Sequence, residues 1–181
     1  MDRELLGKRR HIMSTASSPV TPVQLTWIRS NLKGRYELTA NGPIVGSLQR
    51  VGFWKSTSRA EFKGQSWSFQ RKGLGSTRIF QEPGAQHVAE FKANWLGGGT
   101  LIFADGQQFR LATRGFWHPV WSWLNNHGQT LVDVTPHNKR VFLVSGAENR
   151  YLPVLIMLSW HQILQSNDDA AAVMAASAAG G

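Results

Sequence analysis

Basic side chains are the residues of this chain best suited to bind a charged ligand. Between residues 50 and 78 they outnumber the single acidic residue, Glu61. If neighbouring strands bring them together, they form a patch for the phosphate of an anionic lipid headgroup or of another polyanion. The predicted ligand-binding residues are Arg50, Lys55, Arg59, Lys63, Arg71, Lys72 and Arg78. The alternative is a basic face that contacts only solvent, and the sequence leaves it open.

Acid–base groups are present, but no catalytic pattern connects them. The candidates are Glu61, Glu90, Asp133, His118, His127 and His137. None belongs to a triad, a carboxylate pair or a phosphate-binding loop that the sequence reveals. We therefore predict no catalytic residues and a protein that is not an enzyme.

The six histidines are the only soft metal ligands, because the chain has no cysteine. Without cysteine there are no disulfides and no thiolate ligands. No two histidines have the i,i+4 spacing of ligands on one helix face. We predict no metal site and no cofactor.

The net charge of +9 belongs mostly to the body of the chain. Between Gln24 and Glu148 there are 15 basic and 7 acidic residues. A body with a net charge of about +8 attracts nucleic acid or anionic lipid headgroups, with nucleic acid as the less favoured partner.

Eight tryptophans are spread through the body. Large rings at i and i+2, such as Trp67 with Phe69 and Trp121 with Trp123, favour a packed core, because alternate residues share one face of a strand. A stacking platform for nucleic-acid bases is the alternative interpretation.

Period-2 alternation with a turn every 8 to 12 residues predicts an all-β barrel or sandwich. The predicted strands are Gln24–Ser30, Arg35–Ala40, Pro43–Arg50, Arg59–Lys63, Ser66–Lys72, Thr77–Gln81, Gln86–Lys92, Thr100–Phe103, Gln107–Ala112, Val120–Leu124, Gln129–Val134 and Lys139–Ser145. Glycines recur at spacings of 22, 20, 22 and 22 from Gly42 to Gly128, which indicates a meander of hairpins. Asn41-Gly42 and Asp105-Gly106 are predicted two-residue turns with positive φ at both positions.

The run from Leu152 to Leu164 is nearly all apolar. Asn149 is a suitable cap, and Pro153 is tolerated in the first turn. A helix of this length spans about 21 Å, short of the roughly 30 Å of bilayer hydrocarbon. A helix this apolar is normally buried on all sides, and its polar residues, such as His161 and Gln165, then need partners.

Twelve strands enclose a lumen too wide for their own side chains to fill. Closing the sheet around the apolar helix removes the sheet edges and buries the helix. The predicted fold is therefore mainly β: a closed antiparallel barrel of about 12 strands, in a hairpin meander, around a C-terminal apolar helix.

This arrangement resembles the tubby-like β-barrel superfamily of tubby C-terminal domains, phospholipid scramblases and LURP-one-related proteins, and is most similar to its small uncharacterised members. The likeness covers Gln24 to Asp169 and rests on these segments: Tyr151–Leu164 with Asn167-Asp168-Asp169, the turn Asp105-Gly106 after Thr100–Phe103, and the aromatic strands Ser66–Phe69 and Val120–Trp123. The resemblance implies phosphoinositide binding through basic side chains, as in tubby domains, or membrane association, as in scramblases, some of which use the terminal helix as an anchor. No local motif transfers individual lipid-binding residues to this chain.

Three parts of the chain are expected: a disordered leader at 1–22, the barrel at 23–167 with its central helix at 150–166, and an Ala/Gly-rich tail at 168–181 whose early part extends the helix. The charged start lacks an apolar stretch after it, so we expect no secretory signal and a cytoplasmic protein, with peripheral membrane association left open. The predicted function is a non-enzymatic module that binds anionic lipid or another polyanion. An enzyme with a small site at the barrel mouth, or a nucleic-acid-binding protein, is the alternative.

Overall fold

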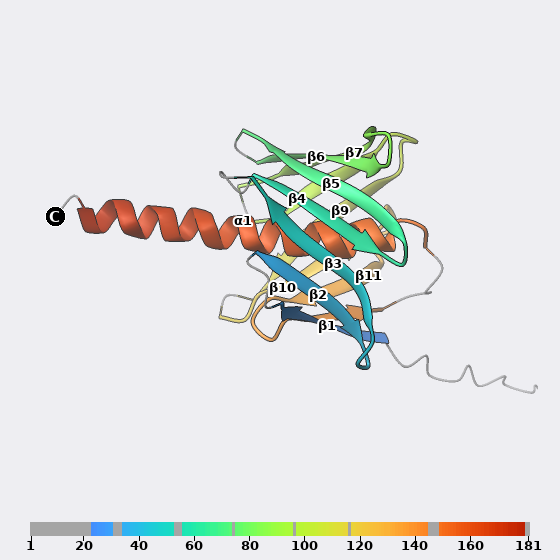
Figure 1. Ribbon diagram of the computed structural model, residues 1–181, viewed down its shortest axis with the longest axis horizontal. Helices are drawn as coiled ribbons and strands as arrows, with labels where there is room; N and C mark the ends of the chain where they lie inside the picture. The colour runs from blue at the N-terminus through green and yellow to red at the C-terminus, as the bar shows by residue number, and fades with distance from the viewer. Residues whose placement is uncertain are drawn as a thin grey trace, which may run out of the picture.

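Twelve antiparallel strands close into one barrel, and a single helix runs through it (Figure 1). The computed structural model describes residues 23–30, 34–52, 56–73, 75–95, 97–115, 117–144 and 149–179. Each strand pairs with its neighbours in sequence, and β1 pairs with β12 to close the ring. The predicted fold class is confirmed. Lys55 and the predicted leader at 1–22 lie outside the described residues.

The strands follow the predicted order, with ends that differ from the prediction by at most two residues. They are β1 (Val23–Arg29), β2 (Arg35–Ala40), β3 (Ile44–Val51), β4 (Thr57–Phe62), β5 (Gln65–Lys72), β6 (Ser76–Glu82), β7 (Gln86–Ala93), β8 (Gly99–Phe103), β9 (Gln108–Arg114), β10 (Val120–Leu124), β11 (Thr130–Thr135) and β12 (Arg140–Leu143). Helix α1 (Leu152–Ala179) follows them.

Buried and exposed side chains alternate along the strands, and the buried ones form the inner wall of the barrel. On β5, Trp67 and Phe69 are buried, whereas Gln70 and Lys72 are exposed, because successive side chains of a strand point to opposite faces. Among the described residues four tryptophans are buried, as expected if these rings fill the core. Three lie on strands, Trp27, Trp67 and Trp123, and Trp160 lies on α1.

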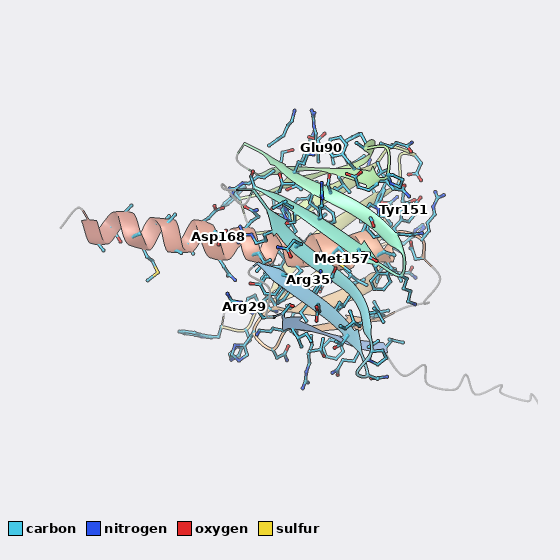
Figure 2. All side chains as sticks on the ribbon, viewed as in Figure 1. Arg29, Arg35, Glu90, Tyr151, Met157 and Asp168 are labelled. Atoms are coloured by element: carbon cyan, nitrogen blue, oxygen red, sulfur yellow. The ribbon has the colours of Figure 1, made fainter. Side chains whose placement is uncertain are left out.

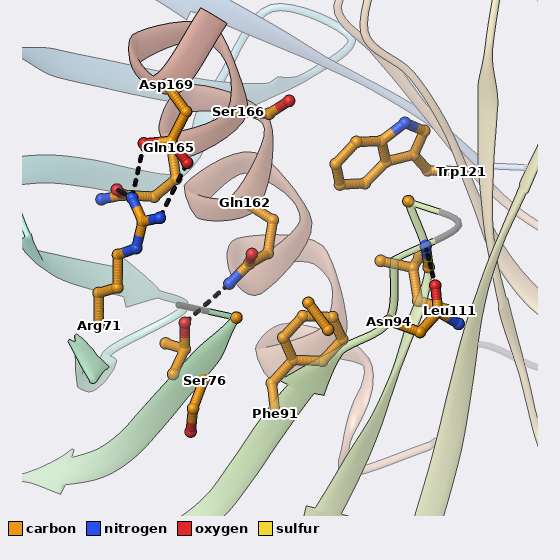
Figure 3. Close-up of a pocket in the computed structure, with 15 residues that line it drawn as sticks. Arg71, Ser76, Phe91, Asn94, Leu111, Trp121, Gln162, Gln165, Ser166 and Asp169 are labelled. Carbon is orange, nitrogen blue, oxygen red and sulfur yellow. Dashed lines mark hydrogen bonds and ion pairs between the residues drawn. The ribbon is translucent and has the colours of Figure 1, made fainter. Parts of the chain in front are cut away.

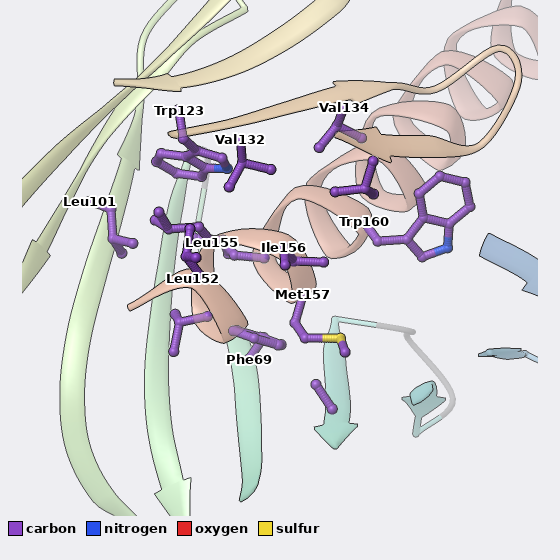
Figure 4. Packing of buried hydrophobic residues seen from close by; sticks show 14 of the residues in the cluster. Phe69, Leu101, Trp123, Val132, Val134, Leu152, Leu155, Ile156, Met157 and Trp160 are labelled. Carbon is purple, nitrogen blue, oxygen red and sulfur yellow. The ribbon is translucent and has the colours of Figure 1, made fainter. Parts of the chain in front are cut away.

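The first half of α1 is the centre of the core (Figure 4). Leu155, Met157 and Leu158 are fully buried. The wall approaches the helix so closely at Gly46 that a Cβ there would lie 2.5 Å from Met157 Cε and 2.7 Å from the Glu61 carbonyl oxygen. Trp160 stacks on Trp27 of β1, with ring centroids 5.2 Å apart. Burial of each large apolar side chain contributes about 1.5–3 kcal/mol.

The helix begins later and ends later than predicted. The Asn149 side chain accepts a hydrogen bond from the Tyr151 N–H at 2.9 Å, which confirms the predicted cap. Helical structure starts at Leu152 and continues to Ala179, because the alanines after Asp169 favour helix. The second half therefore leaves the barrel and projects from one end of it (Figure 1).

The two predicted glycine turns differ in geometry. Asn41 and Gly42 both have positive φ, as predicted. At the second turn only Gly106 does, and its N–H donates to the Phe103 carbonyl at 2.9 Å. The prediction of a positive φ for Asp105 is wrong, because the loop between β8 and β9 is longer than two residues and needs only one residue, Gly106, in the left-handed conformation.

We predict that Leu155→Asp prevents folding, because it buries an unpaired charge at the centre of the barrel, at a cost above about 4 kcal/mol. Met174→Asp, on the exposed second half of the same helix, is the matched control and should leave the midpoint of thermal unfolding unchanged. Circular dichroism melts compare the two variants. A folded Leu155→Asp protein would contradict the central position of the helix.

Candidate functional site

The two ends of the barrel differ in what they expose. We call the end where α1 leaves the barrel the helix-exit end, and the end where α1 begins the helix-entry end (Figure 1). Because the pairing is antiparallel throughout, the odd-numbered strands finish at the helix-exit end and the even-numbered strands start there. Residues far apart in the sequence meet around the emerging helix.

The six predicted basic residues that the structure describes do not lie on one face of the barrel. Arg50 and Arg71 point inward, because they follow the buried residues Leu48 and Phe69 by two positions. The others are spread along the barrel. Arg59 lies on the outer face of β4, and Arg78 lies on the outer face of β6. Lys72 lies at the exit end of β5. Lys63 lies in a turn at the entry end, over the Phe62 ring.

The inward-pointing arginines hold the helix where it leaves the barrel. Arg50 pairs with Asp168. Arg71 forms a bidentate salt bridge with Asp169, with nitrogen–oxygen distances of 2.8 and 2.9 Å. Nη1 of Arg71 also donates a hydrogen bond to the Gln165 side-chain oxygen at 3.1 Å. The hydrogen bond to Asp169 is the main reason why the pKa of Arg71 is raised.

Two further contacts complete this polar layer. The Gln162 amide donates to the Thr77 hydroxyl at 2.9 Å, and Nδ1 of His161 lies 2.9 Å from the Ser58 hydroxyl oxygen. One turn deeper, Ser159 accepts a hydrogen bond from the Trp123 indole at 2.7 Å. Each of these three helix side chains, Ser159, His161 and Gln162, therefore makes at least one hydrogen bond to the barrel wall.

His161 is neutral in the folded protein. Its ring is fully buried and stacks on Phe69, with centroids 5.5 Å apart. Burial, with a smaller contribution from the positive charges of Arg50 and Arg71, lowers the pKa of His161 to about 3. Among the described residues, its Nε2 has no hydrogen-bond partner.

Exposed cations surround the emerging helix. Five of them make no ion pair with any acidic side chain in the described ranges, and we call them the exit-end cations: Arg29, Lys72, Lys92, Lys139 and Arg140. Lys72 and Lys92 both face Ser76 across their strand pairs, so they flank one position on the outer wall. Figure 2 places Arg29, Arg35 and Asp168 towards this end and Tyr151 at the other.

Large apolar side chains are exposed at the same end. Trp95 follows β7 and is 92% exposed, and Trp117 precedes β10 and is 84% exposed. On the projecting half of α1, Val173 and Met174 are 70% and 72% exposed. Exposed apolar residues at the helix-entry end are smaller, namely Val23, Ile44 and Val144. The two exposed tryptophans differ from the prediction that aromatic residues fill the core.

At the helix-entry end, polar contacts fix the start of α1. The Tyr151 hydroxyl donates to Asp105 at 2.6 Å, and Arg150 pairs with the same carboxylate at 2.5 Å. The hydrogen bond from Tyr151 is the main cause that lowers the pKa of Asp105. The Tyr151 ring packs on Phe103, with centroids 4.5 Å apart. These contacts attach the last strand-to-helix connection to the β8–β9 turn.

The candidate acid–base groups are dispersed. The rings of His118 and His137 lie 4.8 Å apart at the helix-exit end, whereas Asp133 accepts from the Ser122 hydroxyl at 2.5 Å on the outer wall. Within the part of the chain that the structure describes, no group of three or more histidine, aspartate or glutamate side chains is placed to hold a metal ion. No described helix has an apolar stretch sufficient to cross a membrane.

The closed barrel with its C-terminal helix is consistent with the tubby-like architecture that the sequence resembles. Comparison of the chain with protein-family models, curated proteins and solved structures finds no match. Support for a function therefore comes from the chemistry of the two barrel ends.

We predict that His161 makes the protein less stable as the pH falls from about 6.5 towards 3. Over this range the unfolded chain binds a proton at this histidine and the folded protein does not, which costs about 1.4 kcal/mol per pH unit. In urea unfolding at a series of pH values, His161→Leu should lose this one-proton dependence. His87→Leu, at an exposed position, should keep it, and an unchanged slope in His161→Leu would contradict the assignment.

Proposed function

We propose that this protein is a non-enzymatic module that docks on anionic membrane surfaces with its helix-exit end. The observation that carries the proposal is the coincidence, at this end, of the exit-end cations with the apolar side chains of Trp95, Trp117, Val173 and Met174. Cations beside exposed aromatic and aliphatic groups match a layer of anionic headgroups above hydrocarbon.

The cations supply the electrostatic part of the attraction. Each lysine or arginine near an anionic bilayer contributes about 1 kcal/mol, so the five exit-end cations contribute roughly 5 kcal/mol at low salt. The attraction is screened over about 10 Å at 0.1 M salt. Docking should therefore require anionic lipid and weaken steeply as salt is added.

The apolar groups supply the part that does not depend on salt. Indole rings favour the boundary between headgroups and hydrocarbon, because one edge is polar and the rest is apolar. The helix beyond Asp169 projects roughly 15 Å at 1.5 Å per residue. The negative charges at the base of this projection, Asp168 and Asp169, are already paired with Arg50 and Arg71, so they repel an anionic surface less than free carboxylates would.

We further propose that the chain belongs to the tubby-like superfamily, whose members include lipid-binding and membrane-associated proteins. Three features support this proposal: the closed ring of twelve antiparallel strands, their order, and the C-terminal position of the buried helix. We assign phospholipid binding to the helix-exit end, whose exit-end cations share only Lys72 with the stretch from Arg50 to Arg78.

Single-stranded nucleic acid is the second candidate ligand. Trp95 and Trp117 are exposed, and each follows a cation, Lys92 or Arg114, by three residues in the sequence. Bases stack on such rings while cations hold the phosphates. The projecting helix distinguishes the two candidates, because its aliphatic side chains have a role at a bilayer and none on a nucleic-acid strand.

We predict that replacing Lys72, Lys92 and Lys139 by glutamine weakens binding to vesicles of phosphatidylserine and phosphatidylcholine about a hundredfold, since three cations contribute roughly 3 kcal/mol. The control replaces Arg59, Lys63 and Arg78 by glutamine; it removes the same charge from the outer faces of β4 and β6 and from the entry-end turn, outside the exit-end cations, and should bind normally. Vesicle co-sedimentation over a salt series measures both.

Equal losses in the two triple variants would exclude the helix-exit end as the docking surface. A chain that ends at Ala170 separates the two ligands. It should lose affinity for vesicles and keep its affinity for a single-stranded oligonucleotide, because it lacks only the apolar projection. Binding to the oligonucleotide but not to vesicles, by the full chain, would replace the membrane proposal by the second candidate.

A further inference from the structure

A cavity of about 240 Å³ lies beside α1 at the helix-exit end (Figure 3). The helix lies closest to β3, β4, β5 and β11, so it leaves space towards β6 to β10. Small residues on that side of the barrel keep the space open, namely Gly75, Ala93, Gly97 and Gly98. The cavity therefore results from the off-centre position of the helix and from the small side chains on the opposite wall.

One wall of the cavity is a polar stripe on α1. Gln162, Gln165, Ser166 and Asp169 line it, and their i, i+3, i+4, i+7 spacing places them on one face of the helix. The rest of the buried helix is almost wholly apolar. Gln162 donates to Thr77, and Arg71 donates to Gln165 and Asp169, so these contacts hold the stripe in place along the cavity, with the Ser166 hydroxyl at its outer end.

The opposite wall combines an aromatic surface with further polar groups. Figure 3 shows Trp121 across from the helix, with Phe91 and Leu111 below it. The Asn94 side chain lines the cavity and accepts a hydrogen bond from the Gly98 N–H at 2.9 Å, which fixes its orientation. Ser76 also borders the cavity, but its hydroxyl donates to Glu90 on the outer face of the sheet at 2.9 Å.

The charges in the cavity wall cancel. Arg71 is the one cation among the lining residues, and Asp169 takes both of its terminal nitrogens. The cavity therefore does not select anions, in contrast to the exposed cations outside it. Its volume holds roughly eight water molecules at about 30 Å³ each, which suits a single ring and excludes a nucleotide.

We infer that this cavity binds an uncharged polyhydroxyl ring, such as a hexose, either free or as the headgroup of a glycolipid. The Trp121 indole offers a flat surface for the C–H face of the ring. The Gln162 amide nitrogen donates to Thr77, so the Gln162 side-chain oxygen would accept from a ligand hydroxyl group, and the Ser166 hydroxyl can donate or accept. The inference does not depend on membrane docking, because its ligand is neutral and its contacts lie inside the barrel wall.

The test is an NMR titration of the isotope-labelled full chain with methyl glucoside, methyl galactoside and myo-inositol. We expect saturable shifts, for at least one of them, that centre on Asn94, Gly98 and the Gln162 side chain. Ala93→Leu fills the cavity and should weaken binding at least tenfold. Ala104→Leu makes the same change at an exposed alanine of the helix-entry end and should have no effect.

Ser166→Leu is a second filling variant on an exposed helix position, in case Ala93→Leu does not fold. Neutral phosphatidylcholine vesicles with and without a glucosyl lipid identify the source of the ring. Binding to the glycolipid alone, lost in the filling variants, assigns a membrane headgroup; binding to the free glycosides assigns a soluble ligand. The inference is overturned if no ligand produces a response that disappears in the filling variants. Binding of the same variants to anionic vesicles tests the proposed membrane docking separately.

Discussion

Burial of the first half of α1 inside the barrel is the constraint on which the rest of the structure depends. A ring of twelve strands is too wide to be filled by its own side chains, and a helix as apolar as Leu152–Leu164 is insoluble when exposed. The helix fills the lumen of the barrel, and the barrel shields the apolar helix from water. Contacts such as the stacking of Trp160 on Trp27, and the close approach of Met157 to Gly46, show how tightly the two surfaces fit.

Filling the lumen confines ligands to the outer wall and the two ends. The polar layer at the helix-exit end, where Arg50 and Arg71 hold Asp168 and Asp169, marks the boundary between the core and the surface. Beyond it the helix continues without a protein partner among the described residues. The exit-end cations and exposed tryptophans gather around this projection, and this arrangement supports membrane docking as the proposed function.

Most of the fold could be predicted from the sequence because it depends on local patterns. Alternation located the strands, and a single apolar run located the helix. The basic patch was harder to place, because charge along the sequence does not say which face of a strand carries it. The signal for Arg50 and Arg71 was present: two positions after Leu48 and Phe69, they had to point inward. Among the exit-end cations only Lys139 and Arg140 are adjacent in the sequence; the other three lie on β1, β5 and β7, and the closed register brings them to the same end.

Hydrogen exchange along α1 tests the central claim most directly. If the first half of the helix is the core, amides from Leu155 to Gln165 should exchange only through global unfolding, whereas those from Ala171 to Ala178 should exchange rapidly in solution. Anionic vesicles should then slow the second group and leave the first unchanged. Equally rapid exchange in both halves would contradict the account, because the barrel would then have no fixed centre.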